Sequence, residues 1–208
     1  MTSRSRKTAP IKRPEKMNLD TCLTLVLSTW GKDFCTSSQY KNLTGEERRE
    51  SQSIVDLFTE MMHYYFELTP HQWNEEYMEE CCVRHFPRKV SEDPEYFRCI
   101  APVLSAFFTY LDDQHLQPHA GAMAHAVQNL HEQIMEGAVD PKRWCFAKRL
   151  AMAACADGVD VTDAAAFHTY LVECNEKILK GELDPGIFRS DPMDLIFADG
   201  VKKTDRKR

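Results

Sequence analysis

The sequence predicts an all-α fold, and three observations carry this prediction. Apolar residues recur at helical spacing in several stretches, whereas no stretch shows the period-two alternation of a half-buried strand. Glycine is scarce, at 8 of 208 residues, and at least three of the glycines fall where helices are expected to end. Four prolines follow one another at intervals of 24, 24 and 23 residues, and each is expected to open a helix because proline is best tolerated in a first turn. They are Pro70, Pro94, Pro118 and Pro141.

The apolar periodicity indicates about seven helices joined by short loops. In chain order they are expected near residues 18–34, 45–69, 70–86, 94–111, 118–137, 140–156 and 162–178. The polar stretch 35–43 is expected to be a loop. Pro102 is expected to bend the fourth helix, since it removes a backbone hydrogen bond and crowds the preceding turn.

Capping residues support these helix starts. Thr44 and Glu47 have the spacing of a capping box, in which the hydroxyl accepts from the first turn while the carboxylate reaches back. Thr69 and Gln72 repeat the pattern before the third helix. The remaining N-caps are expected at Asp93 and Thr162.

Residues 18–200 are expected to form a single helical domain, most simply an irregular antiparallel bundle. The helix-pair periods of 47 and 44 residues, measured from Pro94 to Pro141 to Pro185, lie near those of armadillo and HEAT repeats. The units are few and their side chains dissimilar, so a bundle is favoured over a short solenoid-like array. Apolar residues near the C-terminus are expected to dock on the bundle: Ile187, Phe188, Leu195, Ile196 and Phe197.

Charge divides the chain into an acidic body and two basic tails. Residues 1–18 carry a net charge of +5 and residues 202–208 carry +4, which leaves −15 on residues 19–201. Residues 1–17 and 201–208 are therefore expected to be basic tails, the first of them disordered. Because an acidic body repels phosphate backbones, nucleic acid could bind only through residues 1–18 and 202–208.

Hydropathy and cysteine usage favour a cytoplasmic protein. No apolar run approaches the roughly 18 residues that a membrane span requires, so no membrane association is expected. The eight cysteines fall mostly in apolar helical stretches, where reduced thiols behave as small hydrophobic residues.

Most catalytic motifs are absent from the sequence. It contains no glycine-rich nucleotide loop and no Gly-x-Ser-x-Gly elbow, so no catalytic or cofactor-binding residue is predicted. The best metal candidate is the group Cys81, Cys82 and His85, in which a thiol and an imidazole one helical turn apart are able to chelate a soft ion such as zinc. A core thiol pair with a half-buried histidine explains the same residues without a metal.

Several landmarks together resemble a poorly characterised prokaryotic helical domain that is often found beside a SEC-C zinc motif. They are Pro87-Arg88-Lys89-Val90, Pro102-Val103-Leu104 with Phe107-Phe108, Trp144-x-x-Ala147-Lys148, and Gly158-Val159-Asp160-Val161-Thr162-Asp163. The resemblance covers about residues 70–175 and implies an all-helical fold. The Cys-x-Cys of the zinc motif is absent here, so the resemblance transfers no site residue.

The function that these observations favour is a non-enzymatic helical protein-interaction module with a protein partner. One alternative is a metal-binding protein or metal-assisted enzyme centred on Cys81, Cys82 and His85, and a second is a nucleic-acid-associated factor acting through the basic tails. Arg88 and Lys89 are the expected interaction residues, since they lie in a linker between two helices. A helix-capping role for Arg88 is the competing interpretation.

Overall fold

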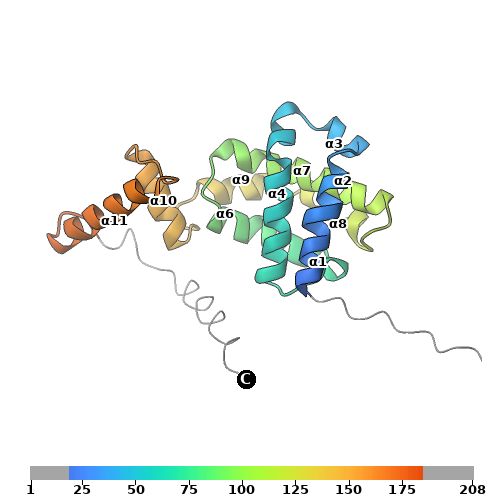
Figure 1. Ribbon diagram of the computed structural model, residues 1–208, viewed down its shortest axis with the longest axis horizontal. Helices are drawn as coiled ribbons and strands as arrows, with labels where there is room; N and C mark the ends of the chain where they lie inside the picture. The colour runs from blue at the N-terminus through green and yellow to red at the C-terminus, as the bar shows by residue number, and fades with distance from the viewer. Residues whose placement is uncertain (1–18, 185–208) are drawn as a thin grey trace, which may run out of the picture.

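The computed structural model describes residues 19–184, and all of this part is helices and turns with no β-strand (Figure 1). The all-α prediction is therefore confirmed. The predictions for the two tails and for the apolar residues after 184 lie outside the described part of the chain. The elements are α1 (Leu19–Leu25), η1 (Val26–Trp30), α2 (Gly31–Phe34), α3 (Ser38–Asn42), α4 (Gly45–Tyr64), η2 (Pro70–Gln72), α5 (Glu75–Glu80), η3 (Cys81–His85), α6 (Phe86–Lys89), α7 (Pro94–Asp113), α8 (Ala120–Gln128), α9 (His131–Val139), α10 (Phe146–Ala156) and α11 (Ala164–Leu179).

Two of the rods are composite helices. The segments α1, η1 and α2 follow one another without a break, and so do α5, η3 and α6. In each rod the middle segment is a π-helical turn, and η2 is a 3₁₀ turn. Short π-helical turns inside α-helices are frequent at functional sites.

The hydrophobic core is built around α7, which packs against α4, α8 and α9. Twelve of its twenty residues are buried, and Pro102 lies within the continuous helix. Edge-to-face aromatic pairs tie the neighbouring rods together, with ring centroids of Phe58 and Trp73 5.2 Å apart and those of Phe58 and Phe108 5.3 Å apart. All buried residues of this core cluster lie between Val26 and Ala138.

The capping residues explain where the two longest helices begin. The Thr44 hydroxyl accepts from Glu47 N at 3.2 Å while the Glu47 carboxylate accepts from Thr44 N at 2.7 Å, which confirms the predicted box. Asp93 accepts from Tyr96 N at 3.0 Å. The predicted cap at Thr162 is wrong by one residue: Asp163 caps α11.

Thr162 instead donates its hydroxyl to the Asp160 carboxylate at 2.6 Å and its amide to the same oxygen at 2.9 Å. The three hydrogen bonds that hold the turn explain why the pKa of Asp160 is lowered: in order, those from the Thr162 hydroxyl, the Thr162 amide and the Asp163 amide. Thr162 therefore stabilises the turn, and the carboxylate of the next residue, Asp163, caps α11.

Only one of the four spaced prolines opens a long helix, so that prediction is largely wrong. Pro94 is the first residue of α7, whereas Pro70 opens only a 3₁₀ turn. Pro118 and Pro141 lie in turns that precede α8 and α10. At Pro141 the turn is complete in itself, because Asp140 accepts from Arg143 N through its carbonyl and from Lys142 N through its side chain, both at 3.0 Å.

Two further expectations are corrected by local hydrogen bonds. The stretch 35–43 is not all loop, because the Ser37 hydroxyl accepts from Tyr40 N at 3.1 Å and caps α3. The predicted fifth helix divides into α8 and α9. Asn129 N and Leu130 N bond to carbonyls three residues back, and this tighter turn ends α8.

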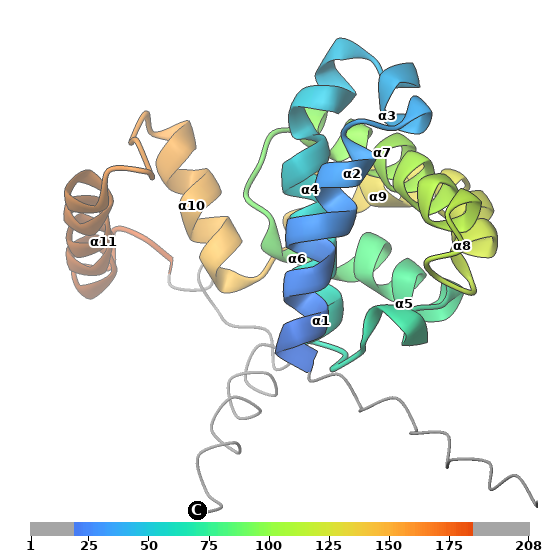
Figure 2. The same cartoon turned by 45° about the vertical axis from the view of Figure 1, so that its right-hand side comes forward.

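The described part separates into a body, residues 19–145, and an arm, residues 146–184. Figures 1 and 2 show α10 and α11 standing apart from the other helices, joined to them beside α6. The sequence predicts a single helical domain at residues 18–200, but it does not predict that α10 and α11 project from the other helices. No described helix combines the length and the apolar character that a membrane crossing requires.

Candidate functional site at the junction of body and arm

The arm is attached where the last turns of the α5–η3–α6 rod meet the start of α10. Cys145 N donates to the Arg88 carbonyl oxygen at 2.9 Å, and Lys148 Nζ donates to the Pro87 carbonyl oxygen at 2.8 Å. The Trp144 indole N–H donates to the Ala138 carbonyl oxygen at 2.9 Å. Three hydrogen bonds from one short segment therefore fix the direction of the arm.

Lys148 is the most deeply buried charged side chain at this attachment, with 1% of its surface exposed. Its ammonium lies 4.6 Å from the Phe97 ring centroid and 4.7 Å from that of Trp144, so two aromatic faces stabilise the charge. Burial lowers the pKa of Lys148 to about 8, while the nearby Cys145 thiol acts in the opposite direction. Lys148 thus joins the arm to the body as a buried cation.

The same attachment collects half of the cationic side chains of residues 19–184. Residues 19–184 contain 14 Lys and Arg against 27 Asp and Glu, a net charge of −13. Segments 84–89 and 142–149 hold seven of the 14 cationic side chains and no carboxylate. We call these two segments the basic junction. Cationic residues are thus concentrated in these two segments, whereas residues 19–184 as a whole are acidic.

The first half of the basic junction surrounds His85. Burial lowers the pKa of His85 to about 4, opposed by Glu80 and reinforced by the charges of Lys89, Arg84 and Arg88. All three cations are therefore close enough to act on one imidazole, which stays neutral near pH 7. Arg84 is exposed and pairs with Glu80 at 2.8 Å.

Arg143, in segment 142–149 of the basic junction, lies close to segment 84–89, near Pro87. A Cβ atom added to Gly137 would lie 2.8 Å from Pro87 Cβ and 3.4 Å from Arg143 Nη1. Gly137 is thus required for the close approach of α9 to α6, and Arg143 extends over the contact. The Arg143 guanidinium is exposed, with an ion pair of 3.8 Å to Asp140. Exposed pairs of this kind contribute little, so both arginines can exchange partners at low cost.

Aromatic side chains border the basic junction. The Tyr65 ring stacks on His85 with centroids 4.8 Å apart, and Lys89 Nζ lies 5.7 Å from the Tyr65 centroid. Tyr65 and Phe146 are each 37% exposed. Partial burial raises the pKa of Tyr65, with smaller contributions from Cys145 and Cys81. Cations and partly exposed rings therefore lie side by side.

The predicted metal ligands are separated by the structure. Cys81 Sγ lies 3.9 Å from Met61 Sδ, and Cys82 Sγ lies 3.9 Å from Met78 Sδ, so the two thiols face different neighbours. Burial raises the pKa of both thiols, which disfavours the thiolate that binds metal. Among the side chains that the structure describes, no three His, Cys, Asp or Glu residues are grouped to hold an ion. The geometry favours a packing role.

The predicted interaction residues Arg88 and Lys89 lie in the basic junction, at the end of α6. Sequence reasoning missed Lys148 and the pair Lys142 and Arg143. The sequence did contain a signal, since two short segments without a carboxylate carry half of the Lys and Arg residues of positions 19–184. Their proximity was not visible in the sequence, because the Lys148–Pro87 hydrogen bond joins residues 61 positions apart.

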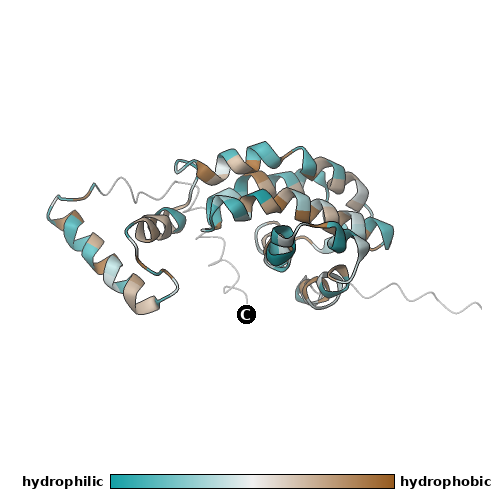
Figure 3. Ribbon diagram, turned by 90° about the horizontal axis from the view of Figure 1, so that it is seen from above, coloured by the Kyte–Doolittle hydropathy of each residue, from teal (hydrophilic) through white to brown (hydrophobic). Residues whose placement is uncertain are grey.

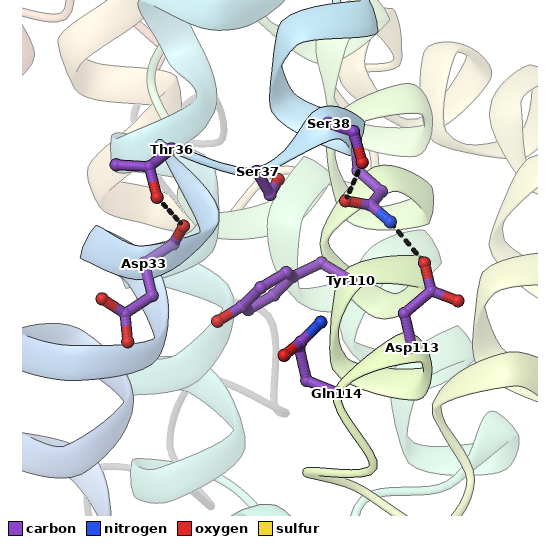
Figure 4. A pocket seen from close by; sticks show the side chains of 8 residues that line it. Asp33, Thr36, Ser37, Ser38, Tyr110, Asp113 and Gln114 are labelled. Atoms are coloured by element: carbon purple, nitrogen blue, oxygen red, sulfur yellow. Dashed lines mark hydrogen bonds between the residues drawn. The ribbon is translucent and has the colours of Figure 1, made fainter.

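A separate polar pocket lies on the far side of the body, between the loop after α2 and the end of α7 (Figure 4). It encloses about 410 Å³, with Tyr110 directed towards Asp33. Its polar groups largely satisfy one another: the Gln39 amide donates to Asp113, and the Ser38 hydroxyl donates to Gln39 at 3.2 Å. Burial and then Asp33 raise the pKa of Tyr110.

Another hollow, of about 260 Å³, lies between the two helices of the arm. The Tyr170 hydroxyl donates to the Asp157 carboxylate at 2.9 Å beside it, and Cys174 is buried there. The hollow therefore lies on the inner side of the arm, where α11 faces α10, and α11 presents its other side to solvent.

Comparison of the chain with protein-family models, with curated proteins and with solved structures finds no match.

Proposed function

We propose that the protein is a non-enzymatic helical interaction module, in which the arm and the basic junction bind a protein partner. The observation that carries the proposal is the exposure of α11. Only one of its sixteen residues, Cys174, is buried, whereas α7 buries twelve of twenty. A helix held away from the body by a defined attachment is suited to contact another molecule.

The exposed side of α11 is apolar at positions that a protein partner would cover. Val172 is 46% exposed and Leu179 is 79% exposed, and the two lie seven residues apart on one face. Figure 3 shows apolar residues interspersed with polar ones along α11, away from the body. Burying a leucine contributes about 1.5–3 kcal/mol, an energy that apolar side chains of a partner supply and a phosphate backbone does not.

The reactive groups of the described residues support a role other than catalysis. The thiols of Cys81 and Cys82 are enclosed in the core, and the amine of Lys148 is engaged with a carbonyl oxygen and two rings. Their altered pKa values follow from packing. The seven described cysteines are free thiols, which supports the cytoplasmic location that forms part of this proposal.

The test is site-specific photo-crosslinking in the native host. A photoreactive residue at position 172 or 179 is expected to give one discrete adduct, identified by mass spectrometry and reproduced with the purified partner. The matched control is position 60, an exposed glutamate of α4. Identical adduct patterns from the arm and from the control position would contradict the proposal.

A Leu179→Asp substitution gives the second readout. It leaves the core unchanged, because Leu179 is exposed, and it is expected to weaken adduct formation at position 172 at least fivefold. An adduct of unchanged intensity would exclude the outer face of α11 as the contact surface.

A further inference from the structure

We infer that the basic junction recognises an acidic segment of the partner protein, a short stretch rich in Asp and Glu. This inference rests on the proposed function and specifies the chemistry of its partner. Charge complementarity carries it: half of the cations of residues 19–184 lie in segments 84–89 and 142–149, which contain no carboxylate.

The cations occupy one place in the fold, although they come from two stretches of the sequence. Arg88 and Cys145 share a backbone hydrogen bond of 2.9 Å, and Lys148 Nζ reaches the Pro87 carbonyl at 2.8 Å. Arg143 Nη1 lies close to Gly137, which itself packs on Pro87. Lys148 is buried and adds its charge from below, while Arg84, Lys142 and Arg143 are exposed, so an anionic segment would meet several cations at once.

The guanidinium groups favour carboxylates as ligands. The two exposed arginines, Arg84 and Arg143, already contact carboxylates close to them in the sequence, Glu80 at 2.8 Å and Asp140 at 3.8 Å. A planar guanidinium matches a carboxylate with two parallel hydrogen bonds, a geometry that these solvent-exposed pairs leave open to exchange. The half-exposed rings of Tyr65 and Phe146 offer apolar contact beside them.

The surrounding acidity favours an acidic protein segment over a nucleic acid. Four of the six residues of α5 are glutamates, Glu75, Glu76, Glu79 and Glu80, and α5 leads directly into η3. An anionic chain that crosses the basic junction meets this acidic helix within one or two helical turns, a distance comparable with the Debye length of about 8 Å at physiological salt. A polynucleotide carries a negative charge at every nucleotide and is repelled there, whereas a protein segment can follow its acidic stretch with neutral residues.

The experiment measures fluorescence anisotropy of a fluorescein-labelled decaglutamate peptide with the full-length protein. Binding is expected, and it should weaken as salt rises from 50 to 200 mM. Reversing two exposed charges by the double substitution Lys142→Glu and Arg143→Glu is expected to weaken binding about tenfold, because two attractions become repulsions. The matched control reverses Lys32 and Lys41, two exposed lysines on α2 and α3, and should change affinity less than about twofold.

Three results would overturn the inference. One is equal weakening by the two double variants, which would mean that only net charge matters. Another is tighter binding of a ten-nucleotide single-stranded DNA, lost in the same variant, which would assign the surface to nucleic acid. A salt-sensitive dimer of the protein alone, abolished by Lys142→Glu and Arg143→Glu, would assign it to a second copy, whose acidic α5 would be the occupant.

Circular dichroism establishes that each variant retains its helical content before affinity is compared. The crosslinks at positions 172 and 179 separate this inference from the proposed function. If the arm forms its discrete adduct and decaglutamate does not bind, the acidic-segment inference fails alone. If neither occurs, the interaction module itself is contradicted.

Discussion

Replacing Lys148 by methionine tests the account of how the arm is attached. The substitution keeps a side chain of similar length at a position that is 1% exposed, and it removes the only group there that titrates. Burial lowers the pKa of Lys148 from its ordinary 10.5 to about 8. Because this lysine loses its proton at lower pH in the folded chain than in the unfolded chain, the free energy of unfolding depends on pH.

The sign follows from the protons bound by each state. Between pH 8 and pH 10.5 the unfolded chain holds a proton on Lys148 that the folded chain has largely released. The free energy of unfolding therefore rises with pH in this window, by about 1.4 kcal/mol per pH unit and about 3 kcal/mol in all. Well below pH 8 both states are protonated and the contribution is constant.

The wild-type curve alone does not isolate this effect. Two acidic groups oppose this effect: the pKa of Tyr96 is raised to about 12 and that of Cys99 to about 11. Because each stays protonated to a higher pH in the folded chain than in the unfolded chain, each lowers the free energy of unfolding as pH rises. Subtracting the stability of the Lys148→Met variant at each pH removes these contributions. Methionine also leaves the Pro87 carbonyl oxygen without its ammonium donor, which displaces the whole difference by a constant amount.

The assay is guanidinium chloride unfolding, followed by circular dichroism, at pH 7, 8, 9 and 9.5. The stability of wild type minus that of Lys148→Met is expected to rise by about 0.4 kcal/mol from pH 7 to 8 and by about 1 kcal/mol from pH 8 to 9. Lys148→Arg is the control, since a guanidinium stays charged throughout and its difference from the methionine variant should not vary with pH. A difference that is constant or falls from pH 8 to 9.5 would refute the buried-cation attachment.

Four further outcomes are expected. Gly137→Ala should lower the free energy of unfolding by about 1–3 kcal/mol, because the new methyl group meets Pro87 Cβ at 2.8 Å, whereas Gly45→Ala meets nothing within 4 Å and should not destabilise; equal values from denaturant unfolding would be inconsistent with this packing. Thr44→Ala should cost about 1 kcal/mol through loss of the helix cap, measured as a shift of the unfolding midpoint at unchanged slope. With a pKa near 4, His85 should make wild type lose stability as pH falls from 6.5 towards 4, by about 1.4 kcal/mol per pH unit relative to His85→Gln, and parallel curves would argue against burial of a neutral ring. Elemental analysis of protein purified without an affinity tag should find well under one bound metal ion per chain, and near-stoichiometric zinc would revive the thiol–histidine site.

The helices that local signals specify were predicted well from the sequence. Thr44 and Asp93 each cap a long helix, and both helices carry a strong apolar stripe, so their starts follow from the pattern alone. The prediction that Pro141 opens a helix is wrong because proline is equally compatible with a turn, and the hydrogen bond from Lys142 N to the Asp140 side chain favours the turn here.

The arm and the basic junction depend on contacts that a pattern does not contain. The apolar periodicity of residues 162–178 predicts that one side of this helix faces inward, with Phe167, Tyr170, Leu171, Cys174 and Ile178 on that side. Periodicity does not say that α10, and not the body, is the described helix beside it. Lys148 likewise has the sequence context of a surface lysine, and only its hydrogen bond to Pro87, 61 positions away, makes it a buried one. Arg88 and Lys89 were expected in a linker, but they form the last turn of α6, and the neighbouring cations could be found only from the fold.

The position of the core cluster has a consequence for how this protein can evolve. Since the cluster draws all its members from residues 26–138, side chains on the outer face of α11 contribute nothing to the interior. If α11 binds a partner as proposed, natural variation there would alter partner choice while the rest of the molecule keeps its margin against unfolding. Selection on recognition and selection on foldability would then act on different stretches of one polypeptide.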